Sequence, residues 1–165
     1  MSGKGDYTPE EWQLLIDIPT MVGAAVMVIG KSGLGSLKES FAMAQGTLSA
    51  VEGYPDNELV QALIQGRLKE GAKSTLESLR HPYKGVDREA FKEIVVEKCR
   101  EAAELLKRKS TEDEARGYKE WALSIGEKVA QAAREGGFLG FGGEQVSQEE
   151  KTALREISTA LGVAA

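Results

Sequence analysis

The residues best suited to chemistry in this chain are one cysteine, one histidine and several groups of adjacent carboxylates. A cysteine becomes a nucleophile when a base such as histidine lies beside it. Cys99 falls in the middle of a predicted helix, whereas His81 precedes a proline in a predicted linker. We therefore expect a buried thiol, a surface histidine, no catalytic residues and no enzymatic activity. An enzyme that uses Cys99 remains the alternative.

Two carboxylates next to a glycine-rich segment, Glu144 and Glu149, are the candidate metal ligands. Hard cations need several oxygen ligands, usually with Asp or Asn in the loop itself. Neither residue type occurs in the glycine-rich segment, and Glu150 is taken up as a helix-capping residue. The other paired carboxylates fall in first helical turns, where the helix dipole favours negative charge. The sequence thus favours no metal and no other cofactor.

The glycine-rich segment 136–143 carries three apolar side chains, Phe138, Leu139 and Phe141, between five glycines. Ordering that many glycines costs conformational entropy, and burial of the three side chains would offset it. The segment is therefore either an ordered loop folded onto the protein or an exposed apolar patch that binds a partner. We take these three residues as candidate binding residues, and leave open whether they are core or surface.

Helix starts are the clearest structural signal in the sequence. A serine or threonine followed three residues later by glutamate is the capping box, in which each side chain satisfies a backbone N–H of the other. Four capping boxes occur, at Thr8–Glu11, Ser36–Glu39, Thr111–Glu114 and Ser147–Glu150. Aspartate caps at Asp56 and Asp87 bring the number of predicted helix starts to six. Apolar residues follow each start at spacings of three and four, and alternation typical of strands is absent. We expect an all-α bundle of about six helices.

Two of these helices carry specific expectations. In the first helix, Tyr7 and Trp12 occupy the positions of a hydrophobic staple. Pro19 lacks an N–H and clashes with the preceding turn, so we expect a kink or a break near it. The helix after Asp56 carries its apolar side chains at Leu59, Leu63, Ile64, Leu68 and beyond.

The predicted organisation is a flexible tail at residues 1–7 and a single helical domain at 8–165. The domain divides into two pseudo-halves, residues 8–80 and 87–162, separated by a proline- and glycine-containing linker. Each half contains two helices joined by a glycine-rich turn, so two glycine-linked helical hairpins are expected.

Charge and apolar content bear on partners and location. The net charge of −5 and the pI of about 5.1 argue against nucleic acid, which is bound through concentrated Lys and Arg. A single cysteine precludes an intramolecular disulfide and fits a reducing cytoplasm. The uncharged run at residues 18–30 is shorter than the ~20 residues that span a bilayer. We expect a buried helix there, with a membrane-peripheral protein as an alternative.

Residues 143–150, Gly-Glu-Gln-Val-Ser-Gln-Glu-Glu, resemble the segment that links helices in the TerB-like (tellurite-resistance) family. Members of that family are all-helical, with small-residue helices leading into an acidic Asp-Gly turn, a Val/Ile-Ser step and a glutamate. Gly142 stands here in the place of the family's aspartate. The resemblance implies an all-α fold, a connection with stress responses and acidic turns associated with metal binding.

These observations predict a cytoplasmic, non-enzymatic interaction or accessory module that binds a protein partner of unknown identity. A small-ligand or divalent-metal sensor of TerB-like type is the alternative function. Neither the partner nor the oligomeric state follows from the sequence.

Overall fold

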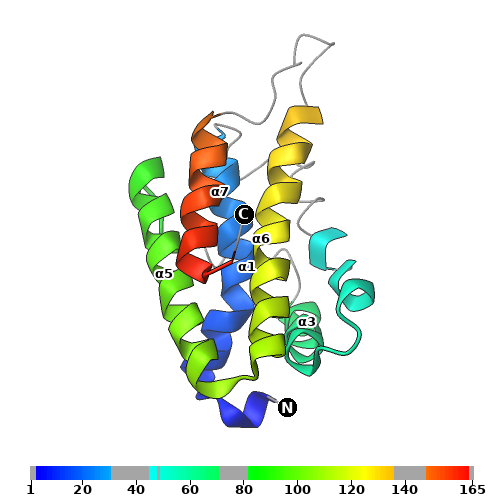
Figure 1. Cartoon of the computed structure of the whole chain (residues 1–165). Helices are drawn as coiled ribbons and strands as arrows, with labels where there is room; N and C mark the ends of the chain where they lie inside the picture. Colours follow the sequence, from blue (N-terminus) through cyan, green and yellow to red (C-terminus); the bar gives the residue numbers. More distant parts are fainter. Residues whose placement is uncertain (1–2, 31–44, 48, 71–81, 136–147, 164–165) are drawn as a thin grey trace.

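The protein is an all-α bundle, as predicted. The computed structural model describes residues 3–30, 45–47, 49–70, 82–135 and 148–163, and these residues contain no strand. A short 3-10 helix η1 (Lys4–Asp6) precedes the bundle. The α-helices are α1 (Pro9–Ile29), α3 (Glu58–Glu70), α5 (Arg88–Lys109), α6 (Glu112–Glu135) and α7 (Gln148–Leu161), with further helical turns at 45–47 and 49–53. This arrangement agrees with a bundle of about six helices (Figure 1).

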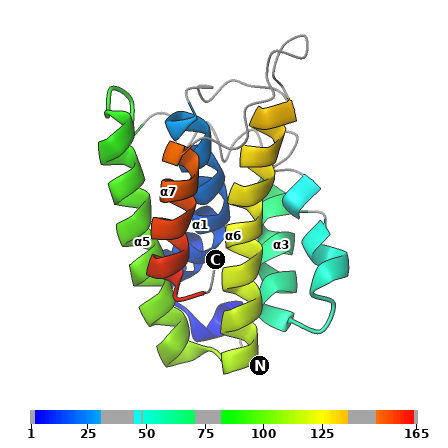
Figure 2. The same cartoon turned by 45° about the horizontal axis from the view of Figure 1, so that its top comes forward.

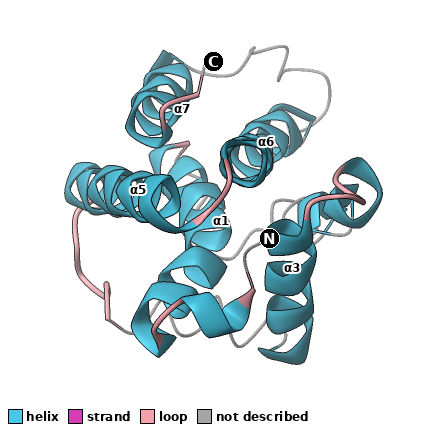
Figure 3. Cartoon of the chain, turned by 60° about the horizontal axis from the view of Figure 1, so that its bottom comes forward, coloured by secondary structure: helices cyan, strands magenta, loops and turns pink. Residues whose placement is uncertain are grey.

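Helix α1 lies at the centre, with α5, α6, α7 and α3 packed around it (Figures 2 and 3). Helices that are apolar on nearly all sides take this position, since every face needs an apolar neighbour. By length and composition α1 is long and apolar enough to cross a membrane, but 78% of that apolar window is buried inside the bundle. The neighbouring helices thus cover the apolar surface of α1.

Side chains cap the helix starts where the capping boxes predicted. The Thr8 Oγ1 accepts from the Glu11 N–H at 3.2 Å, while the Glu11 Oε2 accepts from the Thr8 N–H at 2.9 Å. Thr111 and Glu114 make the same pair of bonds at 3.2 and 3.0 Å. Asp87 caps α5 through the Glu89 N–H. The predicted starts at Ser36 and Ser147 lie outside the described residues.

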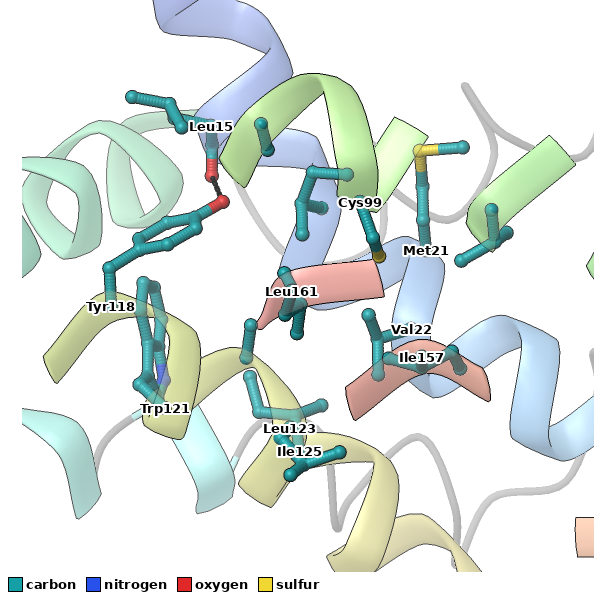
Figure 4. Packing of buried hydrophobic residues seen from close by; sticks show 14 of the residues in the cluster. Leu15, Met21, Val22, Cys99, Tyr118, Trp121, Leu123, Ile125, Ile157 and Leu161 are labelled. Atoms are coloured by element: carbon teal, nitrogen blue, oxygen red, sulfur yellow. Dashed lines mark hydrogen bonds between the residues drawn. The ribbon is translucent and has the colours of Figure 1, made fainter. Parts of the chain in front are cut away.

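The expected break at Pro19 is wrong, because α1 runs through this residue without interruption. A proline leaves the carbonyl four residues earlier without its helical N–H partner, here the carbonyl of Leu15. The Tyr118 hydroxyl of α6 donates to that carbonyl at 2.7 Å, in a buried setting (Figure 4). A side chain from another helix thus replaces the hydrogen bond that Pro19 removes.

The structure corrects two further expectations for α3. Its cap is Asn57 in place of Asp56, because the Asn57 Oδ1 accepts from the Val60 N–H at 3.0 Å. The Asn57 amide also donates to the Glu114 carbonyl at 3.2 Å, so the start of α3 is held against the start of α6. Leu68, predicted to pack in the core, is 53% exposed.

Small residues set how closely the helices approach. A Cβ on Gly117 would collide with the Asn57 amide, and one on Gly126 would meet the Val22 Cγ1 at 2.9 Å. Gly117 therefore leaves room for the Asn57 cap of α3 beside α6, and Gly126 lets α6 pack directly against α1. Between them, Tyr118 and Trp121 fill the core edge to face, with ring centroids 6.0 Å apart.

Candidate functional site

Most of the sequence-predicted site residues lie outside the described part of the chain. This applies to Phe138, Leu139, Phe141 and Glu144, so their predicted roles stay predictions. Glu149 is described, and its side chain is exposed in the first turn of α7. Among the described residues, no group of three or more His, Cys, Asp or Glu side chains is placed to hold a metal ion.

The Cys99 thiol is fully buried between α5 and its neighbours (Figure 4). Burial raises the pKa of this thiol to about 12. Because the thiolate is the nucleophile, the structure places Cys99 among the packing residues, as predicted. This burial removes the main support for the alternative of an enzyme that uses Cys99 as its nucleophile.

Glu150, also in the first turn of α7, is 5% exposed and covers Gly30 at the end of α1, where a Cβ would collide with its carboxylate. The C-terminal end of α1 and the start of α7 therefore meet at one end of the bundle. Glu149, in contrast, is exposed.

A groove of about 600 Å³ runs between α1, α5 and the turn at residues 82–83. Helix α1 contributes the residues that share one of its faces, and α5 and the turn contribute the rest: Pro9, Glu10, Gln13, Leu14, Asp17, Met21, Pro82, Tyr83, Lys98 and Glu101. We call this the α1–α5 groove. Glu10, Leu14, Asp17 and Met21 follow one another at i, i+4, i+7 and i+11, so the helical repeat places them on one face of α1.

The floor of the α1–α5 groove is apolar and firmly held. Met21 is 3% exposed, and Leu14 and Tyr83 are half-buried against the hydrophobic core. The Tyr83 ring packs edge to face on Phe91 of α5, with centroids 5.3 Å apart. These contacts fix the floor without filling the groove.

The rim of the groove is mostly acidic. It carries the carboxylates of Glu10, Asp17 and Glu101 and one cation, Lys98. Lys98 pairs with Glu101 at 3.2 Å, and Asp17 accepts from the Gln13 amide at 2.9 Å. The lining residues that the structure describes therefore sum to a formal charge of −2, from three acids and one base.

A second cleft, of about 550 Å³, lies between the 53–58 turn and the first two turns of α6. We call it the α3–α6 cleft. Its lining is acidic: Asp56, Glu58, Asp113, Glu114 and Glu120, with Arg116 as the one cation. Arg116 pairs with Asp113 at 2.5 Å. Burial, and next Glu120 and Glu127, raise the pKa of the Tyr54 phenol that borders this cleft.

A third groove, between α5 and α7, is occupied by its own ion pairs. Lys92 bonds both Glu89 and Glu156 at 2.8 Å. These two hydrogen bonds, with Glu156 first, raise the pKa of Lys92. The pair of Lys92 with Glu156 therefore joins α5 to α7 across this groove.

Sequence reasoning missed both the groove and the cleft. A signal for the groove was present, because Glu10, Gln13 and Asp17 form the polar stripe of a helix that is otherwise apolar. Leu14 stands within that stripe. The cleft had no comparable signal, since it arises where segments far apart in the sequence meet.

No family model matches the sequence, and no curated protein or solved structure shows significant similarity to it.

Proposed function

We propose that this protein is a non-enzymatic interaction module that binds a segment of a partner protein in the α1–α5 groove. The observation that supports it is the apolar floor, where the half-buried side chains of Leu14 and Tyr83 remain accessible beneath a polar rim and Met21 lies buried behind them. Interfaces of this kind gain affinity by burying an apolar anchor within a polar, water-accessible rim.

The rigidity of the groove favours binding over chemistry. Its walls belong to two long helices whose termini are capped, so little ordering entropy is lost when a ligand docks. Three described groups with nucleophilic or acid–base capacity have structural roles: Cys99 packs in the core, and Glu11 and Glu114 cap helices. Binding uses what the groove offers, namely shape, apolar area and charge.

Selection of phage-displayed random peptides on the folded protein tests this proposal. A Leu14→Arg variant places a charged side chain on the groove floor. Leu68→Arg is the matched control, since Leu68 is an exposed apolar residue of α3 outside the groove. Selected peptides should bind the wild type and Leu68→Arg and lose binding to Leu14→Arg, with all three chains melting alike by circular dichroism. Peptides that bind Leu14→Arg as well as the wild type would refute the groove as the site.

The glycine-rich segment is part of the same proposal. If Phe138 and Phe141 extend the binding surface, alanine at both positions should weaken capture of the selected peptides and leave helix content intact. Loss of the fold in this double variant would instead assign both side chains to the core.

A sensor of a small cationic ligand or a divalent metal is the second candidate. The α3–α6 cleft favours the small cationic ligand, because five carboxylates and one arginine line a space of ligand size beside the Tyr54 ring, while no three of its described carboxylates are placed around one metal ion. Carboxylates attract cations, and an aromatic face adds a cation–π contribution. The candidate ligands Glu144 and Glu149 and the TerB-like resemblance belong to this candidate as well.

Titration calorimetry separates the second candidate from the first. Ca²⁺, Mg²⁺, Zn²⁺ and spermidine are the probes, and Glu120→Gln removes one carboxylate of the cleft. Heat that Glu120→Gln diminishes would support a cation site in the cleft, and heat that Glu149→Gln diminishes would support one near α7. No heat from any probe at millimolar concentration would dismiss the sensor.

A further inference from the structure

The occupant of the α1–α5 groove can be narrowed by its charge, an inference that rests on the proposed function. Leu14 and Tyr83, both half-buried, offer apolar area at the bottom of the groove. An occupant therefore needs at least one apolar side chain that reaches them. An ion or a fully polar ligand would leave this area exposed to water.

The rim restricts what flanks that apolar side chain. Glu10 and Asp17 lie seven residues apart on α1, on the same face as Leu14 between them. On the facing helix α5, the charge of Glu101 is offset by its ion pair with Lys98, so the negative charge of the rim lies on the α1 side. A bound segment thus meets a carboxylate on either side of its apolar anchor along α1.

The one cation of the rim does not reverse this field. The Lys98 ammonium is held by the Glu101 carboxylate at 3.2 Å. The described residues that line the groove sum to a formal charge of −2, and the whole chain carries −5. Anionic partners, including nucleic acid and anionic lipid, are repelled, whereas a cationic segment is attracted and steered into place.

We infer that the α1–α5 groove binds a cationic amphipathic segment of a partner protein, in which an apolar side chain is flanked by lysine or arginine. The apolar side chain lies on Leu14 and Tyr83, and the flanking cations interact with the carboxylates on the α1 side of the rim. Charge decides between this partner and neutral or acidic segments with the same apolar residue.

Fluorescence anisotropy with three labelled peptides tests the inference. The peptides share the same apolar residues and differ in their flanks, which are lysine, glutamine or glutamate. The lysine peptide should bind tightest and the glutamate peptide weakest. Affinity for the lysine peptide should fall as salt rises, because rim charges near the surface are screened.

The rim is then altered in the protein. Glu10→Gln together with Asp17→Asn should weaken the lysine peptide by about twofold to fivefold per carboxylate, and leave the glutamine peptide nearly unchanged. Glu112→Gln is the matched control, since it removes an exposed first-turn carboxylate of α6 outside the groove. Glu10→Gln alone provides the test if the double variant melts at lower temperature than the control.

The outcomes separate this inference from the proposed function. Equal or tighter binding of the glutamine or glutamate peptide, lost in Leu14→Arg, would overturn the cationic partner and keep the groove as a binding site. Binding of phosphatidylserine vesicles that Leu14→Arg abolishes would likewise overturn it in favour of a membrane. If no peptide depends on Leu14, both the inference and the proposed function fail.

Discussion

The Tyr118 hydroxyl of α6 donates to the Leu15 carbonyl of α1 at 2.7 Å, the carbonyl whose helical partner Pro19 removes. Both groups are buried, and burial raises the pKa of Tyr118 well above its ordinary value. The phenol therefore stays protonated and keeps its donor. This bond lets the central helix contain a proline without interruption, and so keeps the α1 wall of the groove continuous.

Tyr118→Phe should lower the free energy of unfolding by about 1–3 kcal/mol, because it leaves a buried carbonyl unsatisfied. In a Pro19→Ala background, the restored N–H of residue 19 can bond to the Leu15 carbonyl, so the same substitution should cost less. Urea denaturation of the wild type, the two single variants and the double variant gives the coupling free energy between Tyr118 and Pro19. Equal costs in both backgrounds would show that the bond does not compensate for the proline.

Gly117→Ala should destabilise the protein by about 1–3 kcal/mol, since the added methyl overpacks the contact with the Asn57 cap. Gly53→Ala is the matched control, because a Cβ there meets nothing within 4 Å. Thermal melts followed by circular dichroism compare the two. A Gly117→Ala protein as stable as the control would mean that α3 and α6 are not this close.

Cys99 should resist alkylation by iodoacetamide at pH 8 in the folded protein, because its pKa of about 12 leaves almost no thiolate and burial blocks access. In denaturant the thiol becomes exposed and should react at the ordinary rate. Mass spectrometry of both reactions measures the difference. Rapid modification without denaturant would return Cys99 to the list of functional candidates.

Glu11 makes a contribution to stability that depends on pH. The Lys109 ammonium, at 2.6 Å, and next the Thr8 N–H lower the pKa of Glu11 from its ordinary 4.5. A lowered carboxyl pKa gives stability that is present above the unfolded value and lost as pH falls through the folded value. Glu11→Gln should thus be less stable than wild type at pH 7, with the gap closing below pH 4.5. A gap that is constant with pH would contradict the assigned pairing.

Local features of the fold were predictable from the sequence, because a capping box joins groups only three residues apart. The starts at Thr8, Asp87 and Thr111 follow this rule. Asn57 and Asp56 are both capable caps, and the bond from Asn57 to the Glu114 carbonyl involves a residue far along the chain. Local rules cannot distinguish between two such neighbours.

Tertiary contacts explain the other differences. Pro19 predicts a break when only its own helix is considered, and the compensating donor comes from a residue 99 positions later. Trp121 is buried, and its indole N–H donates to the Gly46 carbonyl at 3.3 Å, a contact between residues 75 positions apart in the sequence. The groove and the cleft depend on how helices meet, so the sequence could supply their residues but not their shape.

The most direct measurement is an NMR titration of the ¹⁵N-labelled protein with the lysine-flanked peptide. Amide shifts should move for the groove residues of α1, for Tyr83 and for the α5 turn that carries Lys98 and Glu101. The Leu14→Arg variant should show none of these changes. Shifts confined to the α3–α6 cleft, or no shifts at saturating peptide, would contradict binding in the α1–α5 groove.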